Sequence, residues 1–307
     1  MTRAVVFAYH NVGVRCLSVL LAHDVEVALV VTHQDNPLEN VWFESVAELA
    51  ALHDIPTITP ADPNDPDIVA QISKLSPDFL FSFYYRLMIK RPLLDTARRG
   101  AYNMHGSLLP KYRGRVPVNW AVLAGERETG ATLHRMLEKP DAGAILAQQA
   151  VPILPDDNAH QVFNKVTVAA EIALDRVLPQ LIAGSASEEP QDLARGSYFG
   201  GRKPEDGRID WRAPARSIHN LVRAVAPPYP GAFCAFQGGT LRVLKTLVES
   251  RRSPRSDAPG LYAECGHLYA DCGDGRVLRL LALEFDGKPL DAAGLVARFG
   301  SEKHLLP

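Results

Sequence analysis

The chain has 307 residues, of which 47% are hydrophobic and 22% charged, as in an ordinary globular protein. The net charge of −2 at pH 7 argues against a dedicated nucleic-acid-binding protein, which usually carries a strong basic excess. Residues 196–307 contain 16 Lys and Arg and 12 Asp and Glu. This small excess of positive charge suits the binding of an anionic small molecule at least as well as the binding of RNA.

The first part of the chain alternates apolar runs with segments of helical spacing. The runs predict strands at 4–9, 25–32, 55–59, 77–85 and 101–105. The segments between them predict helices at 14–23, 43–53 and 68–75. Continuous apolar strands alternating with amphipathic helices indicate a parallel sheet covered on both faces. We therefore expect a doubly wound, Rossmann-like α/β sheet with ligands at the carboxyl ends of its strands.

The turn after the first predicted strand lacks the dinucleotide-binding fingerprint. It reads His10-Asn11-Val12-Gly13, with no G-x-G-x-x-G. This pattern argues against NAD or FAD at that turn, and His10 is interpreted as a loop residue rather than a catalyst.

The amino-acid composition of the chain and its predicted elements change at Gly184. Before it, a helix is predicted at 116–124, strands at 130–137 and 144–154, and a long helix at 158–182. After it come a linker rich in Gly, Ser, Pro and charge, a helix at 214–225, and strands at 240–248, 260–264, 267–271 and 277–283, with a mobile loop expected at 253–259. We expect a Rossmann-like domain at 1–200 and a small β-rich, barrel-like domain at 201–307.

The four cysteines show no metal-binding spacing. Cys16, Cys234, Cys265 and Cys272 include no C-x-x-C pair, so they are interpreted as reduced structural residues. The apolar run near the N-terminus is too short for a signal-peptide core, and no run is long enough to cross a bilayer. The sequence predicts a soluble, cytoplasmic protein without membrane insertion and without a metal.

The stretch 101–115, AYNMHGSLLPKYRGR, is the first candidate site. Strand alternation places Asn103 and His105 side by side on one face, and a Pro- and Gly-punctuated basic loop follows. Such a pair at a strand end can form an enzyme site, and it fits a hydrogen-bonded core histidine equally well.

A second candidate is Asp141, in the segment Pro-Asp-Ala-Gly between two predicted strands. The local sequence alone favours the interpretation of Asp141 as an aspartate that stabilises a turn. Together with Asn103 and His105, however, it suggests acyl transfer, since an amide N–H can hold an oxyanion and an imidazole can move a proton. A nearby carboxylate stabilises the protonated imidazole, and no metal or covalent nucleophile is required.

The segment N-M-H-G-S-L-L-P-K-Y-R-G, which starts at Asn103, resembles the signature of the 10-formyltetrahydrofolate-dependent formyltransferases, a family that includes methionyl-tRNA formyltransferase. The resemblance implies a Rossmann-like formyl-transfer domain followed by an OB-like barrel, with 10-formyltetrahydrofolate as cosubstrate. It also implies that Asn103 stabilises the oxyanion, that His105 transfers the proton, and that Asp141 raises the pKa of His105.

Within this family the chain is most similar to the UDP-4-amino-4-deoxy-L-arabinose formyltransferases of lipid A modification and polymyxin resistance. The marks are F-A-Y-H from Phe7, T-H-Q-D-N-P from Thr32, S-F-Y-Y-R from Ser82, L-H-R-M from Leu133, V-R-A-V-A from Val222 and P-G-A from Pro230. The resemblance implies folate contacts by Leu87, Met88, Ile89, Arg115, Leu137, Glu138, Lys139, Pro140 and Asp141. It implies a nucleotide-sugar partner and no nucleic acid.

Several alternatives remain open at this point. Lys111, Arg113 and the Arg202-Lys203 pair could meet a diphosphate or the folate glutamate, although Lys111 and Arg113 fit a solvated loop slightly better. The acceptor could be another nucleotide-linked amino sugar or methionyl-tRNA, and a non-catalytic binding protein would use the same scaffold. The bifunctional relatives continue into a dehydrogenase domain, so the chain is either stand-alone or excised, and its oligomeric state is not predicted.

Overall fold

The computed structural model describes residues 2–37, 39–253 and 258–307. The chain forms two compact units: residues 1–117, 128–152 and 163–200 make the first, and residues 118–127, 153–162 and 201–307 make the second. Of the loop expected at 253–259, residues 254–257 lie outside the described residues. Within the described ranges, no helix has both the length and the apolar character needed to span a membrane.

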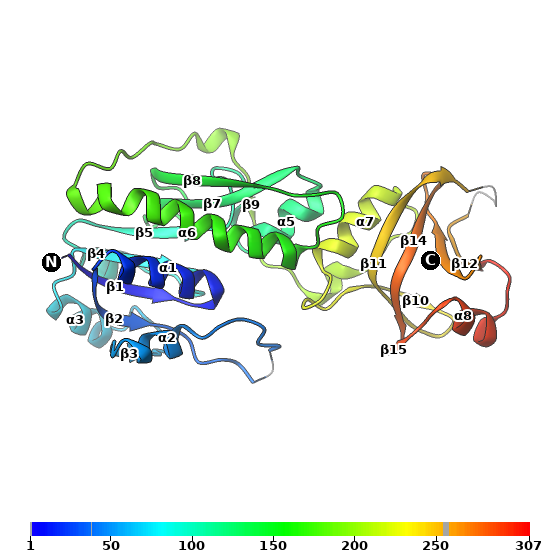
Figure 1. Cartoon of the computed structure of the whole chain (residues 1–307), viewed down its shortest axis with the longest axis horizontal. Helices are drawn as coiled ribbons and strands as arrows, with labels where there is room; N and C mark the ends of the chain where they lie inside the picture. The colour runs from blue at the N-terminus through cyan, green and yellow to red at the C-terminus, as the bar shows by residue number, and fades with distance from the viewer. Residues whose placement is uncertain (1, 38, 254–257) are drawn as a thin grey trace. The chain divides into compact units, whose positions relative to one another are not determined.

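The first unit is built on a seven-stranded sheet with the order β3-β2-β1-β4-β5-β7-β8 (Figure 1). Its strands are β1 (Arg3–Ala8), β2 (Glu26–Val31), β3 (Thr57–Ile58), β4 (Phe79–Phe83), β5 (Gly100–His105), β7 (Glu128–Arg135) and β8 (Ile145–Pro152). The first five strands pair in parallel, while β7 and β8 are antiparallel additions. The order reverses between β1 and β4, as in doubly wound folds. The predicted Rossmann-like sheet is confirmed.

Helices accompany this sheet: α1 (His10–Ala22), α2 (Val46–Leu52), α3 (Pro66–Lys74), the short α4 (Arg91–Leu94) and the long α6 (Ala159–Ala183). Alternate residues of a strand point to the same face of the sheet. Val5 and Phe7 of β1 accordingly pack in one hydrophobic cluster with Ile72 of α3 and Leu93 of α4. His10, interpreted from the sequence as a loop residue, is instead the first residue of α1 and is buried.

The second unit is an antiparallel sheet with the order β10-β11-β14-β13-β12-β16. Its elements are α5 (Pro117–Ala124), α7 (Ala215–Ala224), β10 (Ala232–Phe236), β11 (Gly239–Arg252), β12 (Gly260–Glu264), β13 (His267–Asp271), β14 (Arg276–Phe285), β15 (Lys288–Pro289), α8 (Ala292–Phe299) and β16 (His304–Leu305). The curled antiparallel sheet confirms the OB-like prediction. β10 and α8 are elements that the sequence analysis did not predict.

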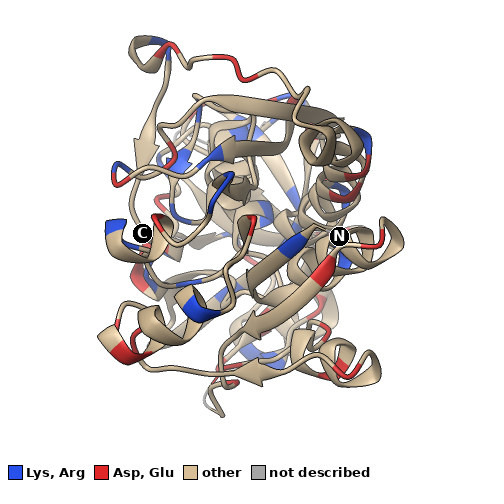
Figure 2. Ribbon diagram, turned by 90° about the vertical axis from the view of Figure 1, so that its left-hand side faces the viewer, with Lys and Arg blue, Asp and Glu red and all other residues tan. Residues whose placement is uncertain are grey.

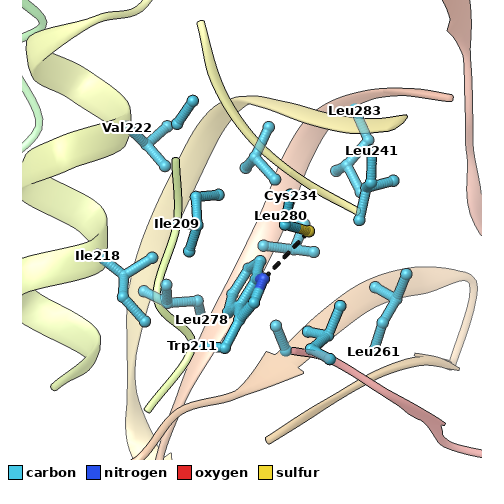
Figure 3. Close-up of a cluster of buried hydrophobic side chains, with 14 of the residues drawn as sticks. Ile209, Trp211, Ile218, Val222, Cys234, Leu241, Leu261, Leu278, Leu280 and Leu283 are labelled. Atoms are coloured by element: carbon cyan, nitrogen blue, oxygen red, sulfur yellow. Dashed lines mark hydrogen bonds between the residues drawn. The ribbon is translucent and has the colours of Figure 1, made fainter. Parts of the chain in front are cut away.

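The core of the second unit surrounds Trp211, which is fully buried (Figure 3). Its indole Nε1 donates to the sulfur of Cys234 at 3.3 Å, so the polar edge of the ring is paired inside the core. Ile218 and Val222 of α7 pack in the same cluster. The helix and the sheet therefore share one hydrophobic core.

Acidic and basic side chains are mixed along the chain. In Figure 2 the Lys and Arg segments lie interspersed with Asp and Glu segments on helices, strands and loops. This distribution agrees with the net charge of −2.

Candidate active site

The carboxyl end of β5 carries two polar side chains on one face of the sheet. Asn103 and His105 alternate there with the buried Tyr102 and Met104. The antiparallel pairing with β7 sets His134 directly opposite Asn103. Directly opposed residues of paired strands point to the same face. His134 therefore lies beside the predicted pair.

The chain turns back toward His105 immediately after β5. Gly106 lies close to Tyr84, since a Cβ at position 106 would lie 1.9 Å from the Tyr84 hydroxyl oxygen and would force that ring to move. Farther along the loop, the carbonyl oxygen of Tyr112 accepts a hydrogen bond from His105 Nε2 at 2.8 Å. The loop thereby holds one ring nitrogen of His105.

A short parallel pairing supports the loop beyond Tyr112. There β6 (Arg113–Gly114) pairs with β9 (Tyr198–Phe199), and the ring of Tyr112 stacks on Phe199 with a centroid separation of 5.3 Å. The Gly114 N–H on β6 donates to Asp141 Oδ2 at 2.9 Å. The loop therefore contacts Asp141 as well as His105.

Asp141 lies in the turn between β7 and β8, with a left-handed backbone at φ +51°. The side-chain nitrogen of Gln191 donates to the carbonyl oxygens of Asp141 and Gly143 at 3.1 and 2.6 Å. Gly143 has no room for a side chain, since a Cβ would lie 2.0 Å from the carbonyl oxygen of Arg135. These contacts hold the turn against β7 and keep Asp141 in a conformation that asparagine and aspartate tolerate.

Two imidazoles face the same oxygen of Asp141. Its Oδ1 lies 3.5 Å from His105 Nδ1 and 3.5 Å from His134 Nε2. His134 Nε2 also lies 3.1 Å from Asn103 Nδ2. Both histidines are buried, and the Asp141 side chain is only 12% exposed. The structure thus brings the three predicted catalytic residues into one cluster, together with His134.

Burial and charge act in opposite directions in this cluster. Burial lowers the pKa of His105, because the charged imidazolium loses hydration, and the Asp141 carboxylate opposes part of that shift. Burial alone would raise the pKa of Asp141, but the positive charge of the His105 imidazolium and the hydrogen bond from the Gly114 N–H hold that pKa well below its usual range. Asp141 is therefore a carboxylate placed to stabilise positive charge on the His105 ring.

The hydrogen bond to Tyr112 determines where His105 can take up a proton. A carbonyl oxygen only accepts hydrogen bonds, so Nε2 carries the proton in the neutral ring and Nδ1 carries the lone pair. Protonation at Nδ1 forms an imidazolium that faces Asp141 Oδ1. The arrangement is therefore suited to general-base chemistry with electrostatic support.

The segments predicted to contact folate follow β4 and β7, the two strands on either side of β5. After β4, Leu87 and Met88 are 40% and 52% exposed, whereas Ile89 is buried in a cluster that also contains Met136, the first residue after β7. The residues after Met136 are exposed or half-buried: Leu137, Glu138, Lys139, Pro140 and Asp141. The two segments therefore converge on one apolar cluster.

Asn64 fixes the backbone of the first of these segments. Its Nδ2 donates to the carbonyl oxygen of Met88 at 2.9 Å, and its Oδ1 accepts from the Lys90 N–H at 2.7 Å. Asp62 Oδ1 accepts from the Asn64 side chain at 2.8 Å. One carboxamide thus pairs with the backbone on both sides of Ile89.

The basic residues named from the sequence belong to both units. Lys111 and Arg115 are exposed on the loop after β5, and Arg113 is half-buried on β6. Arg202, in the second unit, packs over the ring of Trp120. Among residues 2–37, 39–253 and 258–307, no cluster of three or more His, Cys, Asp or Glu could hold a metal ion.

Comparison with known families gives two matches in this chain. The formyl transferase model matches residues 16–178, and the formyl transferase C-terminal domain model matches residues 202–300. The chain belongs to the formyl transferase family. It is a formyltransferase, and the first match covers the strands, the loop and the turn that carry Asn103, His105 and Asp141.

Solved structures share this fold at low sequence identity. An N-formyltransferase from Helicobacter canadensis, in complex with folinic acid and dTDP-3-aminofucose, has a TM-score of 0.73 and 19% identity over 91% of this chain and 99% of that chain. A 4-N formyltransferase from Francisella tularensis has a TM-score of 0.62 and 19% identity over 76% and 91%. HypX from Aquifex aeolicus, in complex with tetrahydrofolic acid, has a TM-score of 0.64 and 18% identity over 97% of this chain and 47% of that chain.

His134 is the residue of this cluster to which the sequence analysis assigned no role. It was noted only within the segment L-H-R-M. Local pattern contains no signal for its position, because its neighbour Asn103 is 31 residues away and the two meet only through the β5–β7 register.

Proposed function

We propose that this formyltransferase transfers the formyl group of 10-formyltetrahydrofolate to the 4-amine of UDP-4-amino-4-deoxy-L-arabinose. The observation that carries the proposal is the cluster of Asn103, His105 and ionised Asp141 at the end of β5. The sequence resemblance to lipid A-modifying enzymes supports the acceptor. The proposal includes the predicted cytoplasmic location and leaves the oligomeric state open.

In the proposed reaction the folate supplies the formyl carbon. The amine nitrogen of the sugar bonds to that carbon while the bond from the carbon to the folate nitrogen breaks. Asn103 would donate an N–H to the formyl oxygen, where negative charge develops. His105 would accept the amine proton at Nδ1, and Asp141 would stabilise the imidazolium at 3.5 Å. His105 would then return this proton to the departing folate nitrogen, which leaves as an N–H group, and so regain its neutral form.

The residues at the ends of β4 and β7 fit a folate. A pterin ring is flat and apolar on its faces, with hydrogen-bonding groups at its edge, so it needs exposed apolar side chains beside accessible backbone. Leu87 and Met88 are exposed apolar residues on a segment whose backbone Asn64 holds in place. Leu137 is 48% exposed on the neighbouring segment, and Arg115 would meet the anionic tail of the folate.

Replacing Asn64 by Ala should raise the KM for 10-formyltetrahydrofolate about 30-fold, since two hydrogen bonds of about 1 kcal/mol each order the segment 87–90. The KM for the sugar should stay within about twofold, which initial-rate kinetics with each substrate varied in turn will measure. Asn158→Ala is the matched control, because Asn158 also accepts from a backbone N–H, that of Gln161. A rise in both KM values with Asn64→Ala would contradict a specific folate role for the segment.

The second candidate acceptor is another nucleotide-linked amino sugar. It is favoured by the similarity to an N-formyltransferase solved with dTDP-3-aminofucose. Methionyl-tRNA is a weaker candidate, because the net charge of −2 is poorly suited to binding a polyanion.

A parallel acceptor assay tests the proposal. The enzyme and 10-formyltetrahydrofolate are presented with UDP-4-amino-4-deoxy-L-arabinose, other UDP- and dTDP-amino sugars, and charged initiator tRNA. We expect the highest kcat/KM with UDP-4-amino-4-deoxy-L-arabinose, measured by mass spectrometry of the formylated product. Preference for a different sugar would overturn the acceptor assignment alone, and formylation of the tRNA without sugar formylation would overturn the proposal.

A further inference from the structure

His134 is a buried histidine that contacts two of the three proposed catalytic residues. It is 2% exposed, and its Nε2 lies 3.1 Å from Asn103 Nδ2 and 3.5 Å from Asp141 Oδ1. It lies on β7, opposite Asn103 across the β5–β7 pairing. A buried imidazole at this point needs a partner for each ring nitrogen.

The other ring nitrogen identifies the tautomer. His134 Nδ1 lies 2.9 Å from the carbonyl oxygen of Arg135, which can only accept a hydrogen bond. Nδ1 therefore carries the proton, and in the neutral ring Nε2 is an acceptor. The 3.1 Å contact is then a hydrogen bond from the Asn103 carboxamide nitrogen to His134, while the 3.5 Å separation from Asp141 is longer than an ordinary hydrogen bond.

This hydrogen bond determines the orientation of the Asn103 carboxamide group. A carboxamide has a donor end and an acceptor end of nearly equal shape, and only the donor end can hold a developing oxyanion. An acceptor at His134 Nε2 selects the orientation with the nitrogen toward His134. The second N–H of that nitrogen is then left for the formyl oxygen.

We propose that His134 is a positioning residue that fixes the Asn103 carboxamide with its N–H toward the transferring formyl group. The inference rests on the proposed role of Asn103 in formyl transfer. His134 itself touches neither substrate and acts through Asn103.

The kinetic test is a double-mutant cycle between the two residues. His134→Met removes the acceptor nitrogen and keeps an apolar side chain of similar length. It should lower kcat about 10- to 30-fold, with both KM values within about twofold of the parent. In the Asn103→Ala background it should lower kcat less than about threefold further, because its effect passes through Asn103. His134→Gln keeps an acceptor oxygen and should recover most of kcat.

His219→Met is the matched control for the loss of a buried imidazole. His219 is 1% exposed in the second unit, with its ring nitrogens 2.9 Å from Thr246 Oγ1 and 3.0 Å from the Pro155 carbonyl oxygen. It should lower the Tm without lowering kcat. If His134→Met lowers kcat by the same factor with and without Asn103, or if His134→Gln is as slow as His134→Met, the proposal is wrong.

A spectroscopic test on the unmodified enzyme is independent of the acceptor. Long-range ¹H–¹⁵N correlation spectra should show the His134 ring proton on Nδ1 rather than on Nε2. The Asn103 side-chain N–H₂ signals, assigned by their loss in Asn103→Ala, should shift in His134→Gln. A proton on Nε2 of His134 would overturn the positioning role. If the acceptor assay finds no formylated sugar, the proposed function fails while this spectrum still tests the hydrogen bond.

Discussion

Replacing His105 by Ala should lower kcat by about 10²- to 10⁴-fold, the usual contribution of a positioned general base. The ring has one nitrogen held by the Tyr112 carbonyl oxygen at 2.8 Å and the other 3.5 Å from Asp141. Alanine removes the only group of this cluster that we propose takes up the amine proton. Because the proton moves during the chemical step, both KM values should change little.

Steady-state kinetics at saturating substrates will measure this loss, with the Tm recorded to exclude unfolding. His23→Ala is the matched control, since His23 pairs with Asp175 at the surface of the first unit. It should leave kcat unchanged. Full activity in His105→Ala would mean that the base has been misassigned.

Replacing Asp141 by Asn should lower kcat by about 10³-fold. Two unit charges 3.5 Å apart interact by about 4 to 5 kcal/mol at an effective dielectric constant of roughly 20, and about 1.4 kcal/mol corresponds to a factor of ten. The substitution keeps the shape of the side chain and an oxygen for the Gly114 N–H. It therefore removes the charge that stabilises the His105 imidazolium with little change in packing.

The same substitution should shift the pH profile in a defined direction. The Asp141 carboxylate raises the pKa of His105 against the lowering effect of burial, so removing it lowers that pKa further. Neutral His105 is the form that accepts a proton. The acidic limb of kcat/KM should therefore move to lower pH in Asp141→Asn, at a reduced plateau. A limb that stays in place or moves to higher pH would contradict the coupling of the two residues.

The strand sequences were sufficient to predict much of the fold. Strands at 3–8, 26–31 and 79–83 agree with the apolar runs 4–9, 25–32 and 77–85, and the long helix at 159–183 agrees with the spacing over 158–182. The strands are buried on both faces and the helix is buried along one stripe. The order of apolar and polar residues along each element therefore predicts its secondary structure.

Elements with mixed or weak patterns were missed. β10 has the sequence AFCAF, in which small and aromatic residues give no clear alternation, and it follows a Pro- and Gly-rich turn. α8 is only eight residues long. The Asp291 side chain caps this helix by accepting a hydrogen bond from the Gly294 N–H. The short length and the cap do not predict a helix by themselves, because a short helix is stabilised mainly by packing, here of Leu295 in the core of the second unit.

The sequence by itself determined that Asn103 and His105 share a face, because alternation along a strand is a local property of the backbone. The motif around them determined the formyl transferase family. Only the tertiary structure decided that Asp141 reaches His105, and that His134 lies against Asn103. Those contacts depend on the antiparallel pairing of β5 with β7 and on the turn held by Gln191, which join residues about 30 to 50 positions apart. Local pattern contains no information on such pairings, because register is set by the packing of the whole sheet.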